Sequence, residues 1–147
     1  MNKIDKALKG MKCIILILLL LAPQLIYAAD SRQMVELPPE MRDGILENMQ
    51  DHLATLLEIL RHLANEDYNK AADSAESRIG LSSPASHSAN YMASLTPKEM
   101  HSIGTRMHTA ASRFARKTRA GDLDQAHDAL GVLTAACVAC HNKYRIR

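Results

Sequence analysis

The sequence contains no tryptophan, a single phenylalanine (Phe114) and only three cysteines in 147 residues. A chain of this length can bury one core. That core must be built from Leu, Ala, Ile, Val and Met, because large aromatic side chains are missing. So few thiols exclude a framework of several disulfides. The sequence also lacks paired carboxylates, a nucleophile constellation and a phosphate-binding loop, so we do not expect an enzyme.

The N-terminal segment has the composition of an export leader. Its lysines come first, at Lys3, Lys6, Lys9 and Lys12, and an apolar run over 13–22 follows. Positive residues, a short apolar run and a small residue such as Ala28 at the cut are typical of a secretory signal peptide. We predict a Sec-type signal peptide over 1–28, a periplasmic location and no stable membrane insertion after cleavage. An uncleaved anchor is the alternative, although the run is short for a span of about 20 residues.

All of the net positive charge lies in this leader. The full chain has 18 basic and 16 acidic residues, and residues 1–29 hold four of the lysines and one of the aspartates. The mature chain would therefore carry 14 basic against 15 acidic residues. This balance gives no indication of nucleic-acid binding.

After an expected extended segment over 29–37, apolar side chains recur at helical spacing. Pro38-Pro39 opens a first helix, because proline is tolerated in a first turn, and residues 65–67 end it. The expected core-facing stripe alternates steps of three and four residues. It consists of Leu46, Met49, Leu53, Leu56, Leu60 and Leu63. A shorter helix then ends near Gly80, and residues 81–96 are predicted to be a crossover loop.

Two further helices follow this loop. Thr96 and Glu99 are expected to form a capping box at the start of the third helix. Ala120-Gly121-Asp122 is expected to end that helix and to begin the fourth. Their apolar stripes are Met100, Ile103, Met107, Ala110 and Phe114, and Leu123, Leu130, Leu133, Cys137, Cys140 and Tyr144. The predicted fold class is therefore all-α, an antiparallel four-helix bundle over 38–147.

The most specific motif is Cys137-Val138-Ala139-Cys140-His141. Two thiols at this spacing reach the two vinyl groups on one edge of a porphyrin, and the adjoining imidazole coordinates iron from the same side. Cys137 and His141 share a helix face, since they are four residues apart. We therefore predict one haem c per chain, covalently bound through Cys137 and Cys140, with His141 as an iron ligand. The haem would lie inside the bundle, attached to the C-terminal helix.

Three other interpretations of the motif remain open. A zinc site would need a second pair of ligands at suitable spacing, and the sequence has no second pair of thiols. A redox dithiol usually lies at a helix start after a strand, whereas this pair lies within a final helix. A structural disulfide is compatible with export, but it gives the adjoining histidine no role.

The C-terminal run Cys137-Val138-Ala139-Cys140-His141-Asn142-Lys143-Tyr144-Arg145 resembles the cytochrome c-prime family, the class II c-type cytochromes built as four-helix bundles. It is also similar to the soluble four-helix b-type cytochrome, whose ligand histidine lies in a similar His-x-Lys-Tyr-Arg context. The resemblance covers roughly residues 38–147. It implies that His141 is the proximal ligand and that Arg145 lies near that ligand or a haem propionate.

The resemblance also places the sixth iron ligand on the first helix. Low-spin members and the b-type relative have methionine there, whereas high-spin members leave the iron open. The matching position is Met49, although methionine is also common core-filling material. His52 is the rival; it shares a face with Met49 but falls outside the predicted stripe. Family members often pair through their first two helices, so the resemblance implies a homodimer.

The remaining histidines and one basic run have weaker indications. We expect surface or boundary positions for His62, His101, His108 and His127, and a loop position for His87. The third helix is basic along one side; its cations are Arg106, Arg113, Arg116, Lys117 and Arg119. That side is either a solvated face or a docking patch for an acidic redox partner or the propionates.

Two functional hypotheses follow. In the first, His141 and Met49 hold a low-spin iron that carries electrons between periplasmic redox partner proteins. In the second, the iron is five-coordinate and captures nitric oxide or carbon monoxide, as the high-spin branch of the resembled family does. A sensor or a subunit of a larger assembly is a third hypothesis that the composition neither favours nor excludes.

Overall fold

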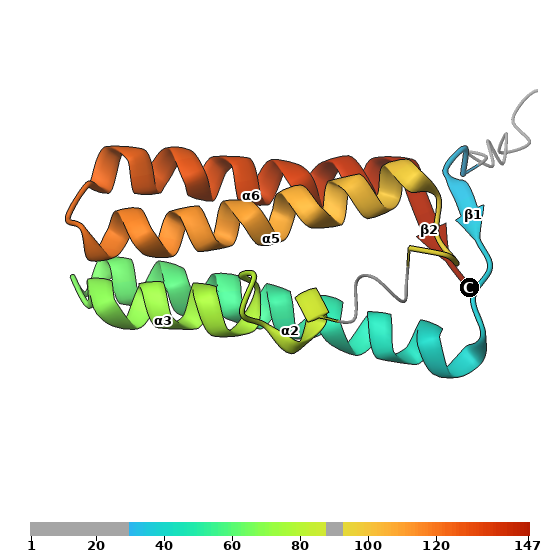
Figure 1. The fold of residues 1–147 in the computed structure, drawn as a ribbon, viewed down its shortest axis with the longest axis horizontal. Helices are drawn as coiled ribbons and strands as arrows, with labels where there is room; N and C mark the ends of the chain where they lie inside the picture. Colours follow the sequence, from blue (N-terminus) through green and yellow to red (C-terminus); the bar gives the residue numbers. More distant parts are fainter. Residues whose placement is uncertain (1–29, 88–92) are drawn as a thin grey trace, which may run out of the picture. The chain divides into compact units, whose positions relative to one another are not determined.

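The computed structural model describes residues 30–87 and 93–147, so the predicted signal peptide over 1–28 lies outside the described residues. Its elements in chain order are β1 (Gln33–Val35), α2 (Pro39–Ala64), α3 (Tyr68–Arg78), α5 (Lys98–Arg119), α6 (Leu123–Lys143) and β2 (Tyr144–Ile146) (Figure 1). The all-α bundle is confirmed: α5 packs against α6 and α3, and α2 packs against α3. Residues 31–147 form one compact unit. Within the described residues, no helix is long and apolar enough to span a membrane.

The predicted break after the first helix is confirmed. The helix α2 begins at Pro39, where the missing N–H of proline costs no helical hydrogen bond. It ends at the cap residue Asn65. Glu66 has a φ of 59°, which reverses the chain before α3 begins at Tyr68.

Ion pairs fix α3 against α2. The Arg78 guanidinium donates to a carboxylate oxygen of Glu58 at 2.6 Å and to Asp51. The hydrogen bond from Arg78 lowers the pKa of Asp51 from its ordinary value. These contacts hold the end of α3 beside the middle of α2, one residue from His52.

The expected capping box at the start of α5 is wrong. The N-cap position is occupied by Pro97, which offers no side-chain hydrogen bond to the helix. The Glu99 carboxylate instead accepts a hydrogen bond from Lys143 Nζ, near the end of α6. Glu99 therefore forms a tertiary ion pair instead of the predicted helix cap. This ion pair joins the first turn of α5 to the last turn of α6.

The predicted turn between α5 and α6 is confirmed. Gly121 has a φ of +74°, a conformation that glycine adopts without steric cost. Asp122 is the N-cap of α6, where its Oδ1 accepts a hydrogen bond from the Gln125 backbone N–H at 3.3 Å. This short connection sets α5 and α6 side by side, as Figure 1 shows.

A two-stranded parallel sheet was not predicted. β1 pairs with β2, with Gln33 opposite Tyr144 and Val35 opposite Ile146. The fourth helix was expected to include Tyr144, but α6 ends at Lys143 and the backbone of Tyr144 is extended. Val35 and Tyr144 are both buried. The sheet therefore ties the segment before α2 to the chain's C-terminal strand.

The core away from the sheet is made mostly of alanine. The fully buried residues with small side chains are Ala71, Ala72, Ala75, Ala111, Ala115, Ala126 and Ala129. Small side chains allow the helix backbones to approach closely. The large apolar side chains in this packing, each fully buried, are Phe114, Ile59, Ile79 and Leu133.

We expect Phe114→Ala to lower the free energy of unfolding by about 3–5 kcal/mol, because the cavity left among alanines cannot be refilled by larger neighbours. Urea denaturation of the holoprotein measures the change. The control Leu57→Ala, at a position that is 49% exposed on α2, should change stability by less than about 0.5 kcal/mol. Equal losses at the two positions would show that Phe114 does not anchor the core.

Candidate functional site

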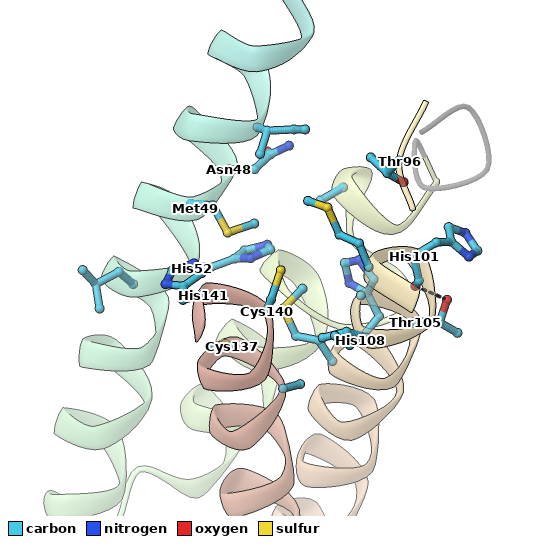
Figure 2. Close-up of a pocket in the computed structure, with 18 of the residues that line it drawn as sticks. Asn48, Met49, His52, Thr96, His101, Thr105, His108, Cys137, Cys140 and His141 are labelled. Atoms are coloured by element: carbon cyan, nitrogen blue, oxygen red, sulfur yellow. Dashed lines mark hydrogen bonds between the residues drawn. The ribbon is translucent and has the colours of Figure 1, made fainter. Parts of the chain in front are cut away.

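A cavity of about 540 Å³ lies between α2, α5 and α6. Its size falls in the range of small-molecule and cofactor sites, about 300–1,000 Å³. Its walls are mainly apolar; the apolar residues that line it include Leu46, Leu53, Leu56, Met100, Ile103, Met107 and Ala136. Figure 2 shows the polar and sulfur-bearing side chains that gather around it from the three helices.

All three chemical groups of the Cys-x-x-Cys-His motif line this cavity. Cys137, Cys140 and His141 lie on the last turns of α6, where steps of three and four residues keep them on one face. Both cysteines are free and half-buried. The Cys137 thiol donates to the Leu133 carbonyl at 3.5 Å. The predicted haem-attachment residues are thus brought together on the cavity wall.

Both thiols are half-buried, which disfavours their ionised form. Burial raises the pKa of Cys137, and burial together with the neighbouring Cys137 raises the pKa of Cys140. Dithiol redox chemistry uses the thiolate, so this environment does not activate the pair for that chemistry. The part of the chain that the structure describes also holds no group of three or more metal-binding side chains.

Met49 and His52 reach the site from α2 in different ways. Both line the cavity. The Met49 side chain is 36% exposed, whereas His52 is 6% exposed. Both ring nitrogens of His52 are buried without a hydrogen-bond partner. Met49 is therefore the more accessible of the two side chains, whereas the His52 ring nitrogens are enclosed.

His52 corrects the predicted stripe on the first helix. The residues of α2 that are buried are His52, Thr55 and Ile59. Several leucines of the expected stripe are instead exposed: Leu46, Leu53 and Leu60 are 44%, 70% and 54% exposed. Leu46 and Leu53 line the cavity, so part of the expected stripe faces the site rather than the packed core.

His108 corrects another expectation, since it is buried rather than at the surface. Its Nδ1 lies 2.5 Å from the Ile79 carbonyl oxygen, and a carbonyl only accepts, so Nδ1 carries the hydrogen. The His108 ring meets the His52 ring edge-on, with centroids 6.2 Å apart and planes at 84°. His101 also lines the cavity. The residues around His101 and His108 do not distinguish them, by hydropathy, from an exposed histidine such as His127.

Arg145 lies in β2, where its backbone is opposite Met34. It is not among the residues that line the cavity. Its predicted position near the haem or the proximal ligand therefore stays a prediction.

The groups around the cavity fit a haem. Two neighbouring thiols and an imidazole come from α6, a thioether comes from α2, and the walls are mainly apolar. A c-type haem needs two thiols for covalent attachment and an imidazole to bind the iron. A methionine thioether is also a known ligand of cytochrome iron. Cys137, Cys140 and His141 would hold the porphyrin on α6, with Met49 facing it from α2.

We expect His52→Leu to stabilise the protein, by about 1 kcal/mol at pH 7, because it removes two buried ring nitrogens that have no partner. Burial and the neighbouring His108 lower the pKa of His52 below the ordinary 6.5. Below pH 6.5 the unfolded state therefore binds a proton that the folded state does not. The contribution of His52 to the free energy of unfolding is therefore fully present above pH 6.5. It decreases as the pH falls toward the folded-state pKa.

The gain from His52→Leu should consequently be larger at pH 5 than at pH 7, as measured by urea denaturation. The same substitution at exposed His127 is the control and should leave the pH dependence unchanged. A gain that is independent of pH would mean that His52 does not titrate differently in the folded and unfolded protein.

One known protein family matches the part of the chain that includes α5 and α6. The family model described as Cytochrome C' matches residues 79–145, which include α5, α6 and the whole Cys-x-x-Cys-His motif. Searches of curated proteins and of solved structures gave no match. The matched segment forms the α5 and α6 walls of the cavity and carries its thiols and imidazole. Residues 79–145, which carry the Cys-x-x-Cys-His motif, are therefore similar to the cytochrome c′ family, and this similarity supports a c-type haem cytochrome.

Proposed function

We propose that the protein is a periplasmic electron carrier in which His141 and Met49 hold the iron of one haem c. The observation that carries the proposal is the position of Met49. It lines, from α2, the same cavity that Cys137, Cys140 and His141 line from α6 (Figure 2). His141 on α6 and Met49 on α2 would hold the cofactor from two separate helices.

The difference in burial supports Met49 over His52. The Met49 side chain is open to the cavity, whereas both His52 nitrogens are enclosed and the ring is packed edge-on against His108. The hydrogen bond from His108 to the Ile79 carbonyl holds that second ring in place. His52 therefore forms part of the wall beside the thioether.

The surrounding residues suit one-electron transfer, which is the chemistry that a bound haem supplies. A thioether opposite an imidazole favours the reduced iron and raises the potential, and an apolar surround acts in the same direction. Leu56, Ile103 and Met107 give the site apolar walls. The thioether links at Cys137 and Cys140 keep the cofactor attached while partners come and go.

The periplasmic location rests on the leader-like sequence over 1–28 and on the thiol pair. Joining two cysteines to haem requires a compartment that handles exported thiols separately. The protein is expected to reach that compartment unfolded and to fold around its haem there.

The visible absorption spectrum of the purified holoprotein tests the proposal, recorded oxidised and reduced, before and after addition of carbon monoxide. We expect sharp low-spin ferrous bands, a weak ferric charge-transfer band at the red end and no response to the gas. A broad high-spin spectrum that shifts with carbon monoxide would contradict the carrier and establish the five-coordinate gas-binding alternative.

A further inference from the structure

One face of α5 is basic along its length. Lys98, Arg106, Arg113 and Arg116 recur on this face, with Ser102, Thr105 and Thr109 between them. At 3.6 residues per turn these positions share one side of the helix, and all of them are exposed. Acidic residues do not occur at any of them. We call this set the basic face of α5.

The cations of the basic face are not neutralised within the part of the chain that the structure describes. Other cations are paired there: Arg42, Lys70, Arg78, Lys117, Arg119 and Lys143 each contact a carboxylate. Arg106 instead donates to the Ser102 hydroxyl at 2.9 Å, which leaves its charge uncompensated. Because the chain beyond the leader is close to neutral overall, this face is a local region of positive potential.

The basic face also borders a groove with an apolar floor. A depression of about 230 Å³ is lined by Arg106, Thr109, Ala110 and Arg113 of α5 and by Val132 of α6, together with Thr105. Val132 is 50% exposed. An apolar centre with a charged rim is the usual composition of a protein interface.

The groove adjoins the haem cavity. Thr105 lines both the groove and the cavity. The basic face and the cavity are therefore separated there by a single side chain. A protein bound over this groove would lie against the α5 wall of the haem cavity. Such a position is what a carrier needs, because electron transfer requires the partner to approach the cofactor.

We propose that the basic face of α5 docks an acidic redox partner protein, whose carboxylates pair with Arg106 and Arg113 and whose apolar side chain covers Val132. This proposal rests on the proposed function as an electron carrier. Complementary charge accelerates encounter more than it adds affinity, and exposed ion pairs are individually weak. The resulting complex is short-lived, as suits repeated exchange of electrons.

The composition of the face favours an acidic protein over a membrane. A helix that lies on a lipid surface carries large apolar residues such as Trp, Phe and Leu beside its cations. The residues between the cations of α5 are serine and threonine. Hydroxyls and guanidinium groups suit hydrogen bonding to carboxylates, whereas they contribute little to insertion among lipids.

Binding of short poly-L-glutamate to the isotopically labelled holoprotein tests the docking surface. We expect amide resonances of residues 98–116 and of Val132 to shift at low salt and to return as salt is raised. Arg113→Glu should weaken binding about fivefold, the effect of about 1 kcal/mol from an exposed charge. The matched control Arg61→Glu reverses one exposed charge near the end of α2 and should leave the affinity unchanged.

A second measurement links the surface to the haem. We expect the reduced holoprotein to be oxidised severalfold more slowly by the anion hexacyanoferrate(III) in Arg113→Glu than in Arg61→Glu, at low salt. Equal effects of the two variants, or shifts spread over all helices, would overturn the docking proposal. Binding to anionic lipid vesicles without binding to poly-L-glutamate would overturn it in favour of a membrane. If the docking tests fail but the holoprotein has a low-spin spectrum that does not respond to carbon monoxide, the proposed function as an electron carrier is still supported.

Discussion

Met49→Leu is expected to convert a low-spin haem protein that ignores carbon monoxide into a high-spin protein that binds it. Leucine is close to methionine in size and apolar, so the substitution leaves the packing of α2 nearly unchanged. It removes the thioether that lines the cavity from the side of α2. The visible spectrum before and after carbon monoxide measures the change, and the ferric charge-transfer band at the red end should vanish.

Met100→Leu is the matched control, because Met100 lines the same cavity from α5. It should leave the spectrum and the response to the gas as they are in the parent protein. A Met49→Leu protein that stays low-spin and gas-inert would contradict ligation by Met49. Combining Met49→Leu with His52→Leu would then decide whether the imidazole of His52 closes the site, since only the double variant would open it.

The α6 half of the site could be predicted from the sequence because its determinants are local. Cys137, Cys140 and His141 are within five residues on one helix, and helical spacing alone places them on one face. The turn at Gly121 and Asp122 was predictable for the same reason, since a positive φ and an N-cap are properties of adjacent residues. Neither prediction depends on residues that are distant along the chain.

The inward face of α2 could not be predicted because its leucines fit more than one stripe. Leu53, Leu56, Leu57, Leu60 and Leu63 satisfy steps of three and four residues in several registers. The packing partners decide between registers, and here α2 packs against α3 and buries His52, Thr55 and Ile59. Two of these three residues are polar, so hydropathy concealed the buried face.

Long-range contacts account for the other differences. The strands β1 and β2 have three residues each, too short to show the alternation that predicts a strand, and they pair across the whole domain. Glu99 matches a capping pattern but pairs with Lys143 on another helix. In both cases the deciding partner is more than 40 residues away along the chain, where local pattern gives no information.

The second large effect is expected from the proposed covalent attachment of haem through Cys137 and Cys140. In a protein with both Cys137→Ala and Cys140→Ala, we expect acidic acetone to extract all of the haem, whereas the parent protein should retain it on the chain. His141 and Met49 remain in this variant, so haem should still bind before extraction and give a low-spin spectrum. Haem staining after denaturing electrophoresis provides the same measurement on the unfolded chain. Val138→Ala, at a 58% exposed position between the two cysteines, is the control and should keep its haem.

Loss of the thioether links should also change how stability depends on haem. A ligand that dissociates stabilises the folded state by RT ln(1 + [L]/Kd), so the melting temperature of the double variant should rise with added haem. The parent protein should carry its haem through unfolding, so its melting temperature should be independent of free haem. A double variant that melts at one temperature at every haem concentration would contradict reversible binding by His141 and Met49. Each single variant should keep one thioether link and resist extraction, because Cys137 and Cys140 each line the cavity and either thiol can hold the porphyrin to α6.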